Sequence, residues 1–95
     1  MIEKTQNYIN GAWVDTQSSE IIEVMNPSDD SVMGVVAAST ADDVDLAVAA
    51  AKDCFQSFQF STKEERIIIL ENIINEYETR AEELASTISS EMGAP

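Results

Sequence analysis

Cys54 is the first of the few residues in this chain whose type could support covalent chemistry. The chain has 95 residues, with one cysteine and no histidine. A thiol needs a base or a positive field to become a nucleophile, and Ser-His-Asp and Cys-His catalysis both require histidine. Cys54 lies in a helical pattern between Asp53 and Phe55. We therefore expect a small, buried, apolar side chain with no catalytic role.

Acidic side chains suggest a second kind of chemistry, which is metal binding. Asp42, Asp43 and Asp45 are close enough in sequence to chelate Ca²⁺. However, they lack the glycine and the twelfth-position glutamate of an EF-hand loop. Acidic residues in the first turn of a helix also complement its dipole. We expect a solvated helix start here rather than a calcium site.

Ser31 is the third candidate. In a small acidic chain, Asp30-Ser31 followed by two apolar residues is similar to the phosphopantetheine attachment site of acyl carrier proteins. In that family the serine begins a helix. Here Asn26-Pro27 precedes it and a strand pattern surrounds it. The acyl-carrier interpretation is therefore kept as the weaker alternative.

Composition limits the partners and the location. Five Lys and Arg against 18 Asp and Glu give a formal net charge of −13, whereas nucleic acids and anionic membranes attract basic surfaces. We expect neither as a partner. The three glycines are scattered, so no phosphate-binding loop is recognisable. A single cysteine suits a reducing compartment and no signal-peptide pattern follows Met1, so we expect a cytoplasmic protein.

The elements that position these residues fall into two halves, and the first half is predicted to form two β-hairpins. Residues 1–38 hold most of the Gly, Pro, Asn and β-branched residues. Asn10-Gly11 is a favoured two-residue type I′ turn between aromatic and apolar strand residues. Residues 21–25 and 32–38 are predicted to form the second pair of strands.

Residues 40–95 are predicted to form two or three helices. We expect N-caps at Thr40, Ser61 and Thr79, the last of which breaks the helix near Arg80. Gly93 is the expected C-cap. Apolar residues at spacings of three and four form one stripe per helix: Val44, Val48, Ala51, Phe55 and Phe58; Ile67, Leu70, Ile74 and Tyr77; Leu84, Ile88 and Met92.

The second of these helices has more apolar surface than a helix with one solvent face needs. Ile68, Ile69 and Ile73 widen its stripe. A chain of this size buries only about 60–65% of its unfolded surface, so its own core is modest. We hypothesise that the chain is a piece of a larger fold. The alternative is a self-sufficient acidic interaction module whose contact surface is the helical face from Ile67 to Met92.

Six motifs between Tyr8 and Pro95 resemble, in order, those of the aldehyde dehydrogenase superfamily. They are Tyr8-Ile9-Asn10-Gly11-Ala12-Trp13-Val14, Asn26-Pro27 with Val32-Met33-Gly34-Val35-Val36, Thr40 to Val48, Phe55 with Phe58, Ser61 to Arg66, and Glu91-Met92-Gly93-Ala94-Pro95. Each motif alone is weak, whereas six at compatible spacing are specific. Two residues depart from the family pattern, because Asp30 replaces a turn glycine and Ala94 replaces a lysine.

The resemblance implies an α/β fold with a Rossmann-type cofactor domain. Residues 1–95 would be the N-terminal part of that domain, with hairpins over 1–38 and helices over 40–95. It implies oxidation of an aldehyde to a carboxylic acid with NAD or NADP, through a thiohemiacetal and a thioester on a catalytic cysteine, assisted by an asparagine and a glutamate. All of these residues lie downstream in the family, so Cys54 is not the nucleophile.

The same resemblance implies which partners the chain has. The remainder of the aldehyde dehydrogenase chain is the expected partner, and the whole protein is expected to form a homodimer or homotetramer. The 95 residues alone are expected to be inactive and to bind no cofactor.

One family site can be transferred to residues of this chain. Many members bind a structural Na⁺ or K⁺ through backbone carbonyls before the Asn-Pro pair and through the carboxylate that begins the C-terminal motif. These positions correspond to Val24, Met25 and Glu91. Ligation by oxygen alone suits a hard monovalent cation. The alternative for Glu91 is an exposed acid near a helix C-terminus, which the dipole mildly disfavours.

Overall fold

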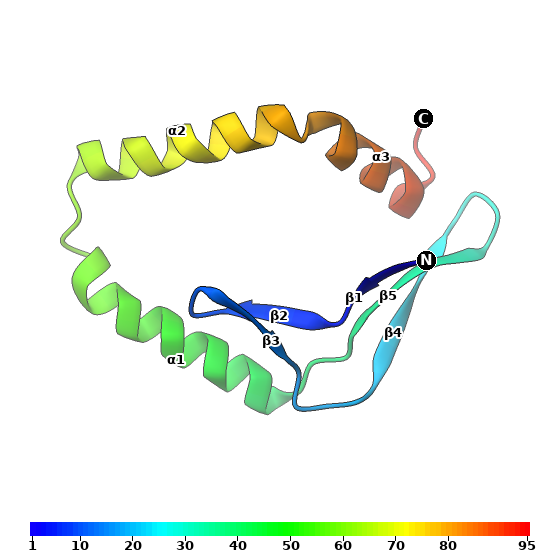
Figure 1. Ribbon diagram of the computed structural model, residues 1–95, viewed down its shortest axis with the longest axis horizontal. Coiled ribbons are helices and arrows are strands. Elements are labelled where there is room, and N and C mark those ends of the chain that lie inside the picture. The colour runs from blue at the N-terminus through cyan, green and yellow to red at the C-terminus, as the bar shows by residue number, and fades with distance from the viewer.

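The computed structural model describes residues 1–95 as five strands followed by three helices (Figure 1). This order agrees with the predicted division of the chain into a β-rich half and a helical half. The elements are β1 (Ile2–Lys4), β2 (Gln6–Ile9), β3 (Ala12–Asp15), β4 (Ile21–Asn26), β5 (Ser31–Ala37), α1 (Ala41–Phe58), α2 (Lys63–Thr79) and α3 (Ala81–Met92).

Strands β2 and β3 form the first predicted hairpin. Asn10 and Gly11 have φ angles of 53° and 77°, so both residues of the turn are left-handed, as a type I′ turn requires. Tyr8 pairs with Trp13 across the strands, and their ring centroids are 5.1 Å apart with planes tilted by 59°. This cross-strand aromatic contact stabilises the hairpin locally.

Strands β4 and β5 form the second predicted hairpin. Asp30 lies in its turn with φ of 59°, a conformation that Asp tolerates better than most residues other than glycine. Asp30 therefore takes the backbone conformation of a turn glycine. Ser31 begins β5, and its hydroxyl donates to the Asp29 carboxylate at 2.6 Å. Because no helix begins at Ser31, the acyl-carrier alternative is wrong.

Strand β1, which the sequence patterns did not predict, pairs in parallel with β5 and makes a three-stranded sheet in the order β1-β5-β4. Gly34 explains why the strands can approach. A Cβ at this position would lie 2.6 Å from the carbonyl oxygen of Ile2, so a side chain there would collide with the backbone of β1. The second hairpin is therefore part of a mixed sheet rather than a separate unit.

Thr40 caps α1 as predicted. Its hydroxyl accepts a hydrogen bond from the Asp43 amide at 3.2 Å, and the Asp43 carboxylate accepts one from the Thr40 amide at 2.8 Å. The cap of α2 is Thr62 rather than Ser61, because the Thr62 hydroxyl accepts from the Glu65 amide at 3.1 Å. Both residues are followed by an acid three positions on, so the local pattern does not distinguish them.

The break between α2 and α3 falls at Arg80, as predicted, but the Thr79 capping box does not form. The Thr79 hydroxyl donates back to the carbonyl of Glu76 at 2.8 Å, and α3 has no side-chain cap. Arg80 and Glu83 form an ion pair at 2.7 Å. Both side chains are more than half exposed, so the pair contributes little stability. Gly93 ends α3 with φ of 71°, as predicted.

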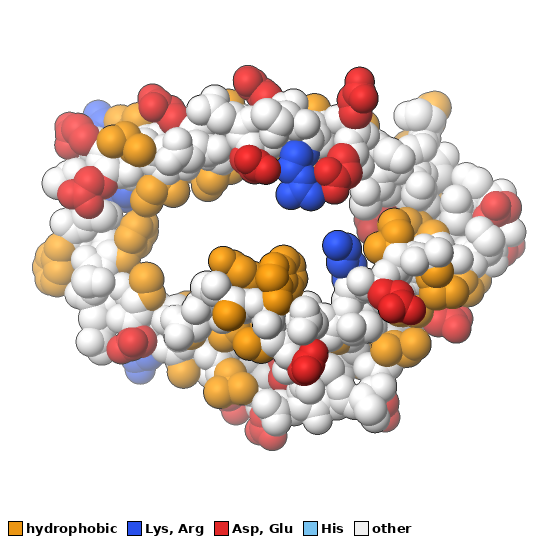
Figure 2. All heavy atoms as spheres, viewed as in Figure 1, with side chains coloured by type: hydrophobic (Ala, Val, Ile, Leu, Met, Phe, Trp, Pro, Cys, Tyr) orange, Lys and Arg blue, Asp and Glu red, His pale blue; other side chains and the backbone are white.

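The chain has almost no core of its own. Only Gly34, Val35 and Asp43 are buried. The accessible surface is 7652 Å², whereas a folded monomer of this mass exposes about 5,400 Å². The radius of gyration is 16.9 Å, against about 12 Å for a domain of this length. The strands and helices enclose an opening that remains open when all atoms are drawn (Figures 1 and 2).

Cys54 shows a direct effect of this missing core. The residue lies on α1 and is exposed, so the prediction that it is buried is wrong for the chain as it stands. The helical pattern around it was correct. No element of these 95 residues covers Cys54.

Candidate functional site

A groove between the three-stranded sheet and α3 brings together two of the three predicted cation ligands. Its volume is about 500 Å³, and both Val24 of β4 and Glu91 of α3 line it. The other charged residues of its wall are Lys4 and Glu83. Met25, the third predicted ligand, does not line the groove. The structure therefore places the end of α3 beside β4, as a shared cation site requires.

The strand opposite the two predicted carbonyl ligands is irregular. Val24 pairs with Gly34, but Met25 pairs with Val32, so Met33 is an extra residue in β5. Such a β-bulge disrupts the ladder of hydrogen bonds and leaves an unpaired residue. The extra residue belongs to β5, and Val24 and Met25 of β4 both keep partners across the bulge.

Close packing fixes the end of α3 against the turn that follows β4. A Cβ at Gly93 would lie 3.2 Å from the hydroxyl oxygen of Ser28 and 3.3 Å from Cγ of Pro27. The Ser89 hydroxyl donates to the carbonyl of Ala94, which holds the residues after the helix against its last turn. The Asn-Pro and Glu-Met-Gly motifs, distant in sequence, thus lie against each other, which positions Glu91 at the groove.

The donor set in the groove fits a hard cation but is incomplete. Val24 would supply a neutral carbonyl oxygen and Glu91 a single carboxylate, whereas Met25 lies outside the groove wall. Carbonyl and carboxylate oxygens suit hard metal ions. No three His, Cys, Asp or Glu side chains lie together in a way that would hold a metal. A cation in this groove would depend on backbone carbonyls and on further ligands from outside these residues.

Asp43 is the one buried charged residue, with 3% of its surface exposed, so the prediction of a solvated acid is wrong at this position. Its carboxylate accepts hydrogen bonds from the Thr16 hydroxyl, the Gln17 amide at 3.0 Å and the Thr40 amide at 2.8 Å. The Thr16 hydrogen bond, followed by the one from the Thr40 amide, lowers the pKa of Asp43 below its ordinary value. Asp43 thereby ties the loop after β3 to the start of α1.

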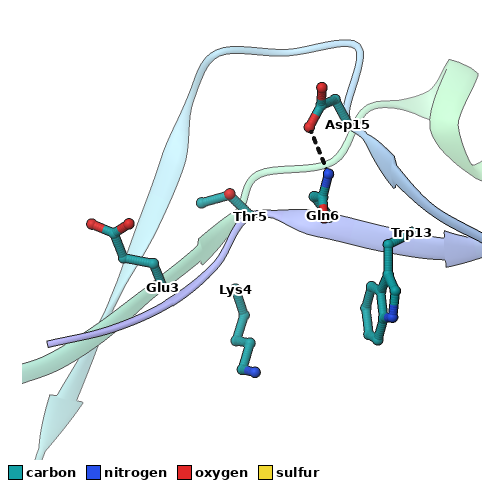
Figure 3. A pocket seen from close by; sticks show the side chains of 6 residues that line it. All are labelled: Glu3, Lys4, Thr5, Gln6, Trp13 and Asp15. Carbon is teal, nitrogen blue, oxygen red and sulfur yellow. Dashed lines mark hydrogen bonds between the residues drawn. The ribbon is translucent and has the colours of Figure 1, made fainter.

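A second groove, of about 340 Å³, lies along the first strands (Figure 3). Lys4 and Trp13 extend to one side of the strands, whereas Gln6 and Asp15 lie on the other. The Gln6 amide donates to the Asp15 carboxylate at 3.1 Å. The lining contains neither a nucleophile paired with a base nor a cluster of metal ligands, so it has no recognisable catalytic arrangement.

The glycines do not fit the phosphates of a dinucleotide. The backbone of Ile2 covers Gly34, and the Pro27–Ser28 turn lies against Gly93. Gly11 is open, but it belongs to a two-residue hairpin turn and not to a loop that leads into a helix. No glycine of this chain is therefore placed to approach the phosphates of NAD or NADP.

The molecule exposes many large apolar side chains. Twenty-three large hydrophobic side chains are exposed, and Figure 2 shows hydrophobic side chains along the inner rim of the opening, over α1, α2 and the first hairpin. No helix has the length and apolar character needed to cross a membrane. We call the exposed apolar residues of the two long helices the apolar helix surface: Val44, Leu46, Val48, Phe55, Phe58, Ile67, Ile68, Ile69, Leu70, Ile73, Ile74 and Tyr77.

Comparison with known proteins gives a consistent result. Residues 13–95 match the aldehyde dehydrogenase family. Proteins named "Putative aldehyde dehydrogenase" from Staphylococcus aureus (strain USA300) and Staphylococcus haemolyticus are 43% identical over 95 and 91 residues, respectively. These matches cover 100% and 96% of this chain but only 20% and 19% of the relatives.

A solved structure of an aldehyde dehydrogenase also matches the chain. The crystal structure of an aldehyde dehydrogenase from Bartonella henselae matches with a TM-score of 0.97 and 38% sequence identity. The match covers 100% of this chain and 20% of that one. The chain therefore spans about a fifth of the length of the relatives that it matches.

Proposed function

The chain belongs to the aldehyde dehydrogenase family, and from this premise we propose that it serves as the N-terminal segment of an NAD(P)-dependent enzyme that oxidises an aldehyde to a carboxylic acid. One observation carries the proposal. All 95 residues match a fifth of a whole aldehyde dehydrogenase with a TM-score of 0.97. The near absence of a core supports the same interpretation, because a segment of a larger fold leaves its apolar surface for the rest of the protein to cover.

The catalytic chemistry belongs to the remaining four fifths of such a protein. The family resemblance implies a cysteine that forms the thiohemiacetal and thioester, an asparagine at the oxyanion and a glutamate that activates water. Cys54 is exposed, and the chain contains no histidine to serve as its base. When bound to the whole protein, NAD or NADP would accept the hydride. The chain by itself would be inactive.

The role of the chain in the whole protein is structural. The apolar helix surface would pack against the downstream part of the cofactor domain, and the assembled protein would be a cytoplasmic homodimer or homotetramer. The Val24 and Met25 carbonyls and the Glu91 carboxylate would contribute to a Na⁺ or K⁺ site. The groove that Val24 and Glu91 share supports this last assignment.

A chimera tests the proposal. In it, this chain replaces the matching fifth of the Bartonella henselae enzyme, and aldehyde-dependent formation of NADH or NADPH is measured. We expect the chimera to elute like the parent enzyme and to be active. A Cys54→Ser version is the matched control and should keep the activity, because the nucleophile lies downstream. A chimera that does not fold or turn over an aldehyde would overturn the proposal.

A further inference from the structure

We propose that the chain can dock as a separate polypeptide onto the downstream part of an aldehyde dehydrogenase, through the apolar helix surface and without a peptide bond between the two pieces. This inference rests on the proposed function and extends it, since it makes the chain a recognition element in its own right. The proposed occupant of the opening is the part of the enzyme that follows the matched segment.

The shape of the surface on α2 favours this occupant. At 100° per residue, six apolar residues lie within an arc about 160° wide: Ile69, Ile73, Tyr77, Leu70, Ile74 and Ile67. Only Lys63 and Arg66, both in the first turn, interrupt this arc, and Ile68 adds an apolar side chain on the opposite side. Glu65, Asn72 and Thr79, each seven residues apart, lie outside this arc. Helix α2 packs extensively on no other element of the chain. An arc of this width needs apolar neighbours in more than one direction, as the interior of a larger domain provides.

A second copy of the chain is a poorer occupant. Two copies would each bring a net charge of −13 to the contact, and like charges oppose close association. The matched enzyme structure contains four fifths of a chain beyond the corresponding segment. That larger part belongs to the same polypeptide as the equivalent segment, so it is the occupant we favour.

The excess accessible surface of the chain is large enough for a permanent interface. The chain exposes 7652 Å², which exceeds the value for a folded monomer of its mass by about 2,200 Å². A standard stable interface buries about 800 Å² on each partner. The surplus on this chain alone is therefore in the range of obligate interfaces.

The docking segments form local contacts of their own. Strand register, the Thr40 and Thr62 caps and the hydrogen bonds to Asp43 define the elements within the chain itself. Partners that are ordered before they bind lose less conformational entropy on association. None of these contacts involves residues outside the chain, which favours recognition without the peptide bond to the downstream part.

The test is co-expression of the tagged chain with the Bartonella henselae enzyme from which the matching segment has been removed. We expect a complex with one chain per truncated subunit by size exclusion and native mass spectrometry. Ile69→Asp combined with Ile73→Asp should weaken binding at least tenfold. Asn72→Asp adds the same kind of charge outside the arc that holds Ile69 and Ile73, and it should bind like the unmodified chain.

A second measurement covers the case in which the truncated enzyme does not fold. A protease site inserted into the folded chimera after Pro95 is cleaved, and the two pieces should still elute together without denaturant. Separation of the pieces from an active chimera would overturn the docking proposal and leave the proposed function intact. Elution of the free chain as a homodimer that excludes the truncated enzyme would also overturn it. An inactive chimera would count against both proposals.

Discussion

Asp43 connects parts of the chain that are far apart in sequence. It accepts hydrogen bonds from the loop after β3 and from the start of α1, and it has the lowest exposure of any polar residue. Because these hydrogen bonds favour the carboxylate, the pKa of Asp43 falls below its ordinary value of 3.8. The stabilisation is then complete above pH 3.8 and is lost as the pH falls through the lower pKa of the folded chain.

We therefore predict a local change at acid pH. Protection of the Gln17 amide from hydrogen exchange should persist down to pH 3.8 and fall at lower pH. In Asp43→Asn the protection should be reduced at every pH and its acid step should disappear. Asp29→Asn is the matched control, because Asp29 accepts from the Ser31 amide and its pKa is also lowered. An acid step at Gln17 that survives in Asp43→Asn would contradict this role.

Thr40 is predicted to stabilise the first turn of α1. Thr40→Ala removes a side-chain cap, which typically costs about 1 kcal/mol. Amides in the first turn of α1 should exchange about five times faster, since about 1 kcal/mol is roughly a fivefold change in an opening equilibrium. Thr62→Ala should produce the same effect in α2 and leave α1 unchanged. Equal exchange rates in α1 for Thr40→Ala and the unmodified chain would contradict the capping role.

Glu91 is predicted to couple K⁺ to stability in the chimera. A cation present at about one hundred times its Kd adds about 2.7 kcal/mol to the stability of the protein that binds it. Glu91→Gln should remove most of the K⁺-dependent rise in Tm. Glu82→Gln, on the same helix but outside the groove wall, should retain it. A K⁺ response unchanged by Glu91→Gln would refute the cation assignment.

The limits of sequence prediction are visible at single residues. Thr40 and Gly93 were identified correctly, because a cap depends on a few neighbouring residues. The hydrogen bonds from Thr16 and Gln17 to Asp43 span more than twenty residues. No local pattern encodes a contact of that kind. The proximity of Val24 and Glu91 came from the family resemblance and not from local pattern.

At the scale of elements, Gly34 determines whether β1 can join the sheet. A Cβ at Gly34 would lie 2.6 Å from the Ile2 carbonyl oxygen, and backbone atoms cannot turn aside as a flexible side chain can. We predict that Gly34→Ala displaces β1 while the pairing of β4 with β5 remains. Hydrogen exchange should accelerate at the amides of residues 2–4.

Gly11→Ala is the control for Gly34→Ala, because it changes a glycine that no backbone atom approaches. Gly11 has φ of 77°, and a methyl group added there would meet no atom within 4 Å, so the substitution strains the turn without a collision. It should weaken the β2–β3 hairpin by about 1 kcal/mol and leave β1 in place. Unchanged exchange in residues 2–4 of Gly34→Ala would contradict the close-approach argument.

The success of prediction differed between elements for physical reasons. Both hairpins and all three helices carry local signals, such as the Asn10-Gly11 turn and the periodic apolar residues of α2. Strand β1 has three residues, all exposed, and pairs with β5 some thirty residues away. Three residues are too few to establish a period of two, and a parallel partner leaves no turn between the strands to recognise.

At the scale of the whole molecule, the chain has ordered elements without the core that would normally hold them together. The hydrophobic pattern predicted a missing partner, and the exposed apolar helix surface agrees with that prediction. The same absence explains why Cys54 is exposed although its pattern indicated burial. A sequence pattern indicates which apolar surfaces must pack against another element. It does not indicate whether that element lies in the same stretch of chain.

The most direct test of the central claim is the intact denatured mass of this protein from its own source cells. The chain has a mass of 10.4 kDa and spans 20% of its relatives, so dividing the mass by that fifth gives about 50 kDa for a protein of family length. We predict a mass close to this value, with the 95 residues as one segment of the polypeptide. A mass of 10.4 kDa would contradict the account, because the cell would then make this segment without the catalytic part.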